Sequence, residues 1–136
     1  MKIIDQTFSV SSKQRNQLID ITSQVQSVVK EAGIENGDVI VFCPHTTAAI
    51  TINENADPSV VSDLLLTLEE TFPENRPGYR HCEGNSDSHA KSSTIGCSEQ
   101  VLIKNKSLVL GTWQAIYFCE FDGPRTRKVI LQIKGI

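Results

Sequence analysis

The chain has 136 residues, 39% hydrophobic and 21% charged, a size and balance typical of one soluble domain with its own core. Thirteen Lys and Arg residues against sixteen Asp and Glu residues leave a net charge of -3, which excludes a nucleic-acid binder that relies on a general basic surface. No apolar run approaches the ~20 residues of a membrane span, and no apolar secretory segment follows Met1, so we expect a cytoplasmic protein without a membrane partner.

The N-terminal segment predicts a hairpin followed by a short helix. Residues 6–10 and 18–21 carry alternating or β-prone apolar positions, and we expect two strands joined as an opening hairpin. The next helix starts with a capping box of Ser23 and Gln26, and it stops at Gly33, which can adopt the left-handed conformation. Polar residues separate each of these elements from the next.

The middle of the chain predicts two strands, a helix and a long loop. The strands cover residues 38–43 and 48–53. Asp57 and Pro58 open the helix, because the carboxylate accepts a free backbone amide and proline is tolerated in the first turn. Residues 72–86 have little periodicity, and a loop of that length is often functional.

The C-terminal part is mostly β. A brief helix is predicted near residues 87–95, and Asp122-Gly123 indicates a hairpin between the last two strands. The strands expected here cover residues 100–103, 107–110, 113–121 and 126–133. The chain is therefore predicted to be a single α+β domain over residues 1–136, a β-sandwich of mixed sheets with two or three helices packed on one side.

All three histidines lie in polar segments flanked by turns. Three neutral imidazoles beside a carboxylate suit a zinc-like divalent metal with a position left open for water or substrate. His81 and His89 lack the i, i+4 spacing of a helical ligand pair, so the fold has to bring them together with His45. Each histidine taken singly is equally compatible with a structural role, and a shared site is the interpretation that we test.

Carboxylates, arginines and one tryptophan supply the other candidate groups. Glu54 can act as a general acid or base, or as a metal ligand, whereas Asp57 is explained by its capping role. Arg125 and Arg127 are two residues apart, so on a strand both can face one phosphate, although such pairs also protect exposed sheet edges. Trp113 either packs in the core or stacks on a ligand ring.

Several familiar signatures are absent. The chain has no P-loop, no dinucleotide-binding GxGxxG after a strand and no GxSxG nucleophile turn. The threonines of Pro44-His45-Thr46-Thr47 offer hydroxyl donors to an anion pocket. The four cysteines form no CxxC pair, and we expect reduced thiols without an assigned role.

A series of motifs, taken in order, resembles one known family. The motifs are Pro44-His45-Thr46-Thr47-Ala48, Asn53-Glu54, Tyr79-Arg80-His81, Asp87-Ser88-His89-Ala90-Lys91, Gly111-Thr112-Trp113-Gln114 and Glu120-Phe121-Asp122-Gly123-Pro124-Arg125. Over nearly the whole chain they resemble the secondary thiamine-phosphate synthase (YjbQ) family. The resemblance implies a compact α+β fold, a homotrimer and a polar pocket that gathers the three histidines.

The resemblance also implies roles for individual residues. It places His45, His81 and His89 in the pocket with Glu54, Asn85, Glu120 and Arg125. Together with the residue chemistry above, this assigns catalytic roles to Glu54, His81 and Glu120, substrate or phosphate contacts to Thr46, Thr47, Asn85, Trp113 and Arg125, and metal binding to His45, His81 and His89. One departure is Asn85-Ser86-Asp87-Ser88-His89, where two serines replace the small residues typical of the family. These hydroxyls either alter the choice of ligand or solvate the turn.

Three functions are compatible with these residues. The first is a transferase of the thiamine-phosphate synthase type, which joins a pyrimidine diphosphate to a thiazole phosphate and releases pyrophosphate with a divalent metal, zinc-like or magnesium. The second is a non-catalytic module that binds a metal or a phosphorylated metabolite. The third is a metal-dependent phosphoester hydrolase. All three predict a phosphorylated small molecule as the ligand.

Overall fold

The computed structural model describes all 136 residues as eight strands and three helices. The strands are β1 (Lys2–Ser11), β2 (Gln17–Asp20), β3 (Asn36–Phe42), β4 (Ala48–Glu54), β5 (Ser98–Lys104), β6 (Ser107–Leu108), β7 (Gln114–Glu120) and β8 (Thr126–Gly135). The helices are α1 (Thr22–Ala32), α2 (Pro58–Thr71) and α3 (Ser86–Ile95). The α+β class predicted from the sequence is confirmed.

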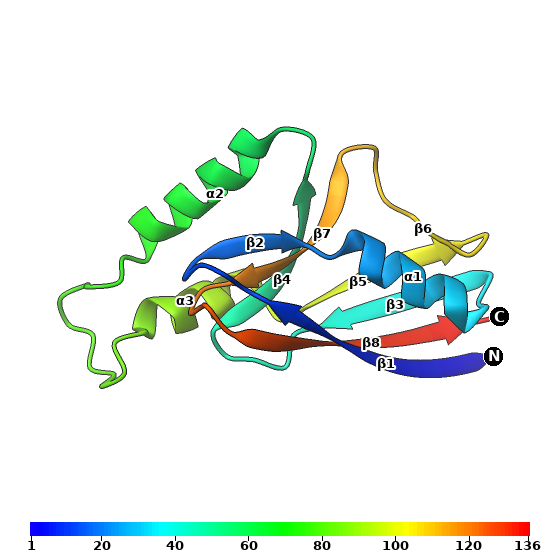
Figure 1. Cartoon of the computed structure of the whole chain (residues 1–136), viewed down its shortest axis with the longest axis horizontal. Coiled ribbons are helices and arrows are strands. Elements are labelled where there is room, and N and C mark those ends of the chain that lie inside the picture. The colour runs from blue at the N-terminus through cyan, green and yellow to red at the C-terminus, as the bar shows by residue number, and fades with distance from the viewer.

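The strands form two sheets (Figure 1). The five-stranded sheet has the order β1-β8-β3-β5-β6, and the three-stranded sheet has the order β2-β7-β4. Every pairing is antiparallel, where mixed sheets were expected from the sequence. The two termini lie side by side because β1 pairs with β8 from Lys2 opposite Gly135 onward.

Consecutive strands belong to different sheets except for β5 and β6, which pair with each other, and this corrects two predicted hairpins. β1 pairs with β8 whereas β2 pairs with β7, so residues 6–10 and 18–21 do not pair with each other. β7 and β8 also belong to different sheets, so Asp122-Gly123 turns a corner between sheets and does not close a hairpin. The physical reason is that alternation identifies a strand and its buried face, but the strand's partner is set by contacts far along the chain.

The helices follow their local signals closely. Asp57 caps α2 by accepting the backbone N–H of Ser59 at 2.9 Å, and α1 ends at Gly33 with a φ of 71°. The predicted capping box of α1 is wrong, because the helix begins without a side-chain cap. Gln26 instead bonds the chain around β6, accepting from the amide of Leu108 and donating to the carbonyl of Lys106.

The core lies between the two sheets and under α1. Its seventeen buried residues are Val10, Ile21, Val25, Val29, Ile34, Val39, Val41, Cys43, Ala48, Ile50, Val101, Ile103, Ile116, Phe118, Val129, Leu131 and Ile133. α2 contributes no fully buried residue. Not one of the three helices combines the length and the apolar composition that a bilayer span requires.

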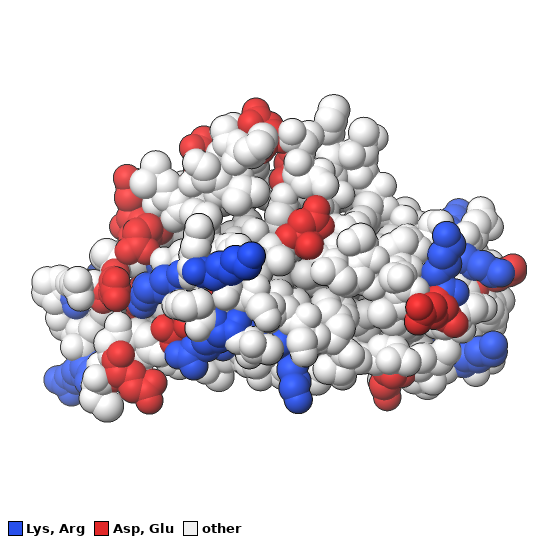
Figure 2. Space-filling view, in the orientation of Figure 1, with Lys and Arg blue, Asp and Glu red and all other residues white.

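Charge is distributed without a single dominant sign. Figure 2 shows acidic and basic side chains interspersed over the visible face. Four of the buried residues are charged and lie at the end of the molecule that carries α3: Asp87, Lys91, Glu120 and Arg127. The fold therefore concentrates its buried charge at one end, where the candidate site lies.

Candidate functional site

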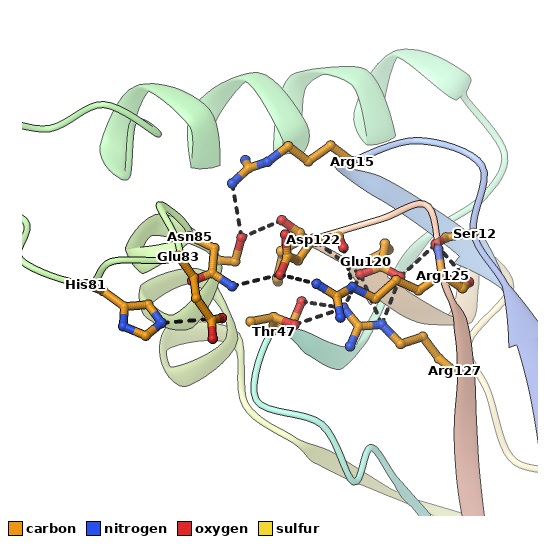
Figure 3. Close-up of polar contacts among 12 residues, drawn as sticks. Ser12, Arg15, Thr47, His81, Glu83, Asn85, Glu120, Asp122, Arg125 and Arg127 are labelled. Atoms are coloured by element: carbon orange, nitrogen blue, oxygen red, sulfur yellow. Dashed lines mark hydrogen bonds and ion pairs between the residues drawn. The ribbon is translucent and has the colours of Figure 1, made fainter.

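The candidate site forms where the chain crosses between the sheets. The connectors after β3 and after β7 meet the start of α3, and the connector after β1 contacts them (Figure 3). These connectors lie far apart in sequence but close together in space. The backbone N–H of Arg125, for example, donates to Oγ of Ser12 at 2.9 Å. Side chains at such corners point away from the sheet ladders, so they are free to gather around a cavity.

A buried ion pair forms the floor of the site. Arg127, on β8, donates through Nε and Nη2 to the carboxylate of Glu120 at the end of β7, and Nη2 also bonds Thr47 Oγ1 at 2.9 Å. Glu120 accepts further bonds from Ser12 Oγ at 2.7 Å and the amide of Asp122 at 3.0 Å. Burial raises the pKa of Glu120, but the bonds from Arg127, Ser12 and Asp122 outweigh it and leave the pKa below its ordinary value.

Above this floor, Asp122 connects two other side chains. Its carboxylate accepts the amide of Asn85 at 2.8 Å and Nη2 of Arg125 at 2.8 Å, while its carbonyl accepts Nε of Arg125 at 2.7 Å. Asn85 is 94% buried, since only 6% of its surface is exposed, and its Oδ1 has no hydrogen-bond partner. Buried polar atoms in native proteins nearly always have a partner, so this acceptor is an exception that needs an explanation.

His45 presents a neutral imidazole to the site. Its Nε2 accepts the backbone N–H of Lys128 at 2.9 Å, which leaves the proton on Nδ1. Burial and the charge of Arg127 lower the pKa of His45, in that order. The Nε2 lone pair is therefore engaged, and His45 is suited to donating a hydrogen bond from Nδ1.

These groups enclose a small polar cavity of about 170 Å³. Its lining contains no hydrophobic residue and consists of His45, Thr46, Thr47, Glu83, Asn85, His89, Asp122, Arg125 and Arg127. We call this cavity the corner pocket. A neighbouring cavity of about 390 Å³ shares His45, Thr46 and His89 with it and extends past Ser92 and Ser93 to Gly96 and Cys97.

α3 is held against the site by buried charge. Asp87, in its first turn, accepts Arg15 through both carboxylate oxygens, at 2.8 and 2.9 Å, and Lys91 at 3.1 Å. Burial raises the pKa of Asp87, but the bonds from Arg15 and Lys91 outweigh it and lower the pKa. Ser88 adds a bond of 2.6 Å to the carbonyl of Phe121. These contacts fix the positions of His89 on α3 and of Asn85, the N-cap residue just before the helix.

The three histidines do not converge on one point as metal ligands. His89 lines the corner pocket with His45, and its ring meets that of His81 edge-on at 5.4 Å between centroids. His81 lies outside the corner pocket, 3.6 Å from the carboxylate of Glu83. No three His, Cys, Asp or Glu side chains converge as metal ligands. The predicted three-histidine metal site is therefore not assembled.

The structure places the predicted site residues other than His81 in three different positions. His45, Thr46, Thr47, Asn85, His89 and Arg125 line the corner pocket as expected. Glu120 lies beneath it, fully buried and bonded to Arg127, so its carboxylate is structural. Glu54 and Trp113 lie at the opposite end of β4 and β7, about 20 Å away at ~3.3 Å per residue. Trp113 is 61% exposed and does not pack in the core.

The sequence does not reveal the roles of Asp122 and Glu83, and it suggests a different role for Arg127. Asp122 was taken only as a turn residue, although it orients both Arg125 and Asn85. Arg127 was paired with Arg125 as a phosphate clamp, but it points inward to Glu120. Glu83 lines the pocket from within the long loop that was predicted to be functional. The length of that loop was the only signal for Glu83.

Comparisons with known proteins agree with this architecture. The sequence model of the family described as "UPF0047 protein YjbQ-like" matches residues 6–136. The UPF0047 protein YugU of Bacillus subtilis is 50% identical over 129 residues, which cover 95% of this chain and 98% of that protein. A UPF0047 protein of Methanocaldococcus jannaschii is 46% identical, over 94% of this chain and 92% of its own.

Solved structures give the same result. A crystal structure of an uncharacterized conserved protein of the YjbQ/UPF0047 family from Clostridium acetobutylicum has a TM-score of 0.93 and 52% identity, covering 95% of this chain and 99% of the other. A YbjQ-like protein of unknown function from Sulfolobus solfataricus has a TM-score of 0.94 and 33% identity, covering 99% of both chains.

These findings correct the functional prediction. The matching family carries no assigned activity, and none of these relatives or structures is named for thiamine-phosphate synthesis. The structure also lacks the metal-ligand group that the metal-dependent transferase, the metal-dependent hydrolase and the metal-binding form of the non-catalytic module required. The prediction of a thiamine-phosphate synthase is therefore wrong as a conclusion from this chain.

Proposed function

The chain belongs to the UPF0047 (YjbQ-like) family, and we propose that its corner pocket binds a small molecule with one anionic group, phosphate or carboxylate, next to a hydroxyl or amino group. The anionic group contacts Arg125 and the Nδ1–H of His45. The hydroxyl or amino group donates to Asn85. The ligand is bound within a single chain by side chains from three separate connectors.

The observation that carries this proposal is the unpartnered Oδ1 of Asn85. The amide nitrogen of Asn85 already donates to Asp122, which fixes the side chain with Oδ1 unsatisfied. Leaving a buried acceptor without a donor costs about 1–3 kcal/mol. Oδ1 is itself closed to solvent, so a ligand that supplies an O–H or N–H removes this cost by shifting the side chains around Asn85 far enough to reach the oxygen.

Charge pairing favours a single anionic group over a polyphosphate. Glu120 neutralises Arg127, and Asp122 neutralises Arg125. In each guanidinium, Nε and Nη2 bond these partners, while Nη1 makes no hydrogen bond within the protein. Glu83 lines the pocket as a further carboxylate, so the pocket offers directed N–H donors without net positive charge, which suits one phosphate or carboxylate better than a polyphosphate.

The size of the pocket sets a limit on the ligand. A cavity of about 170 Å³ has room for roughly five or six water molecules at ~30 Å³ each. A phosphate with a short polyol chain is of that order. A longer ligand extends into the adjoining cavity of about 390 Å³, past His89 and Ser93.

A matched pair of probes tests the proposal on the unaltered protein. Glycerol 3-phosphate carries both the anionic group and hydroxyls, whereas propyl phosphate has the same charge and chain length without the hydroxyls. We expect isothermal titration calorimetry to show at least about tenfold tighter binding of glycerol 3-phosphate, equivalent to ~1.4 kcal/mol. Equal affinities for the two phosphates contradict the role of Asn85.

A matched pair of variants tests the anion contact. Arg125→Gln removes the guanidinium that faces the pocket, and Arg80→Gln removes an exposed guanidinium outside it. We expect Arg125→Gln to weaken glycerol 3-phosphate binding at least about tenfold, as for the loss of a charge-assisted hydrogen bond. Arg80→Gln leaves it unchanged. An equal effect of both substitutions refutes a localised anion site.

Enzymatic turnover, a divalent metal cofactor and the homotrimer implied by the sequence resemblance stay predictions. Elemental analysis of protein purified without chelator tests for the metal. Light scattering coupled to size exclusion gives the number of chains. Incubation of a bound phosphate ester with the protein, followed by product analysis, tests for turnover.

A further inference from the structure

Two of the four cysteines, Cys43 and Cys97, lie directly opposite each other, and Cys97 lines the cavity that adjoins the corner pocket. Phe42 pairs with Ser98 in the antiparallel ladder of β3 and β5, so the next pair in register is Cys43 and Cys97. The backbone N–H of Cys43 donates to the carbonyl of Cys97 at 2.7 Å, which shows that the ladder continues to this pair. Opposite residues project on the same face of a sheet, so the two thiols are neighbours.

The spacing of this pair is close to that of a disulfide. Hydrogen-bonded antiparallel pairs have Cα atoms about 5.5 Å apart, which lies within the ~4.4–6.8 Å range of disulfides. Their Cβ atoms are roughly 4.5–5.5 Å apart, so about 1 Å of approach is needed. Gly96, with a φ of 101°, precedes Cys97 and supplies backbone freedom for that movement.

We propose that Cys43 and Cys97 form a reversible intramolecular disulfide when the protein meets a peroxide, and that this bond regulates the corner pocket. The Cys97 thiolate attacks hydrogen peroxide to give a sulfenic acid and hydroxide, which takes up a proton to become water. The Cys43 sulfur then displaces the sulfenic hydroxyl as a second water. Two thiols are oxidised by two electrons, one peroxide is reduced to two waters, and a thiol reductant reverses the bond.

Solvent access assigns the order of the two steps. Cys97 is exposed and lines the 390 Å³ cavity beside His45 and His89, so a peroxide reaches its sulfur. Cys43 is 1% exposed, and burial raises its pKa to about 11. Cys97 is therefore the first thiol to react, and Cys43 is the resolving thiol. Cys119, which also adjoins Cys43, is fully buried in the interior and has no such access.

The disulfide acts on the pocket through the connector after β3. Cys43 is the first residue after β3 and lies two residues before His45, so a displacement of Cys43 is passed along the chain to the pocket connector. Drawing Cys43 toward Cys97 displaces the connector that carries His45 and Thr47, both of which line the pocket. This regulatory step rests on the proposed function, whereas formation of the disulfide does not.

Peptide mapping tests the disulfide without any ligand. Cleavage after Lys and Arg leaves each of the four cysteines on its own peptide, with Cys43 in 31–80 and Cys97 in 92–104. After treatment with hydrogen peroxide and blocking of free thiols, we expect these two peptides to be linked, and dithiothreitol to separate them. The link is absent in Cys97→Ser and present in Cys82→Ser, which removes the other exposed thiol.

Binding measurements on the same samples test the regulation. We expect the oxidised protein to bind glycerol 3-phosphate at least tenfold more weakly than the reduced protein, and the oxidised Cys97→Ser variant to retain the reduced affinity. A peptide link from Cys43 to Cys119, or between two Cys82 thiols, in place of the expected one overturns the proposal. A Cys43–Cys97 link with unchanged affinity overturns the regulatory part. Failure of the reduced protein to bind the phosphate overturns the proposed function and the regulation with it, while the peptide map still decides the disulfide.

Discussion

Replacing Glu120 with Gln tests whether the buried ion pair supports the corner pocket. The substitution keeps the shape of the side chain, but it removes the charge opposite Arg127 and turns one acceptor into a donor that faces other donors. Breaking a buried pair by removing one partner costs about 3–5 kcal/mol, because the remaining charge is left uncompensated. Glu120 is fully buried and Arg127 is 4% exposed, so solvent cannot replace the lost contact.

The assay is urea unfolding followed by circular dichroism. We expect the free energy of unfolding to fall by about 3–5 kcal/mol, and the melting temperature to fall by roughly 10–20 °C at ~3–5 °C per kcal/mol for a domain of this size. Glu70→Gln is the control, because Glu70 is exposed and makes no ion pair. Its effect is expected to stay within about 0.5 kcal/mol. A Glu120→Gln effect of the same size as the control refutes the reasoning.

The pH dependence gives a second and independent check. The pKa of Glu120 lies below its ordinary value of 4.5 in the folded protein. The ionised carboxylate therefore makes its full contribution to the free energy of unfolding above pH 4.5, and this contribution is lost as the pH falls through the folded pKa. The difference in unfolding free energy between the wild type and Glu120→Gln is therefore constant in the neutral range. It narrows below about pH 4.5, where the wild-type carboxylate becomes protonated. A difference that does not change with pH shows that the lost stability is not electrostatic.

Two further substitutions probe how the site is held in place. Gly123→Ala places a Cβ against the carbonyl of Gln14 and the side chain of Glu120. We expect this overpacking to lower the free energy of unfolding by about 1–3 kcal/mol and to weaken glycerol 3-phosphate binding in calorimetry. Gly111→Ala, whose Cβ meets only a flexible side chain, is the control. Lys91→Met removes one of the two cations that pair with Asp87 and leaves Arg15 as the other. We expect the free energy of unfolding in urea to fall by about 3 kcal/mol. Lys13→Met, at an exposed lysine, is the control and is expected to change it very little. A loss below ~1 kcal/mol for either variant contradicts the packing described.

Features set by local chain chemistry were predictable from the sequence. Asp57 and Pro58 fix the start of α2, and Gly33 fixes the end of α1, because capping and left-handed turns depend on residues that are neighbours along the chain. The polar, turn-rich surroundings of His45, Thr46 and Arg125 mark them as candidates, the family resemblance adds Asn85 and groups them in one site, and all four line one pocket. Polar residues beside turns are seldom needed in the core, so their chemistry was visible without the fold.

Only the tertiary structure decided how these segments combine. The alternation of apolar residues is the same whether β7 pairs with β8 or with β4. The local sequence therefore does not indicate that the chain crosses from one sheet to the other near Ser12, His45 and Asp122. Those crossings bury Glu120 beneath Arg127 and carry Glu54 to the far end of β4. The sequence by itself determined which residue types were available for binding an anion. Long-range strand pairing determined which of them face the same cavity.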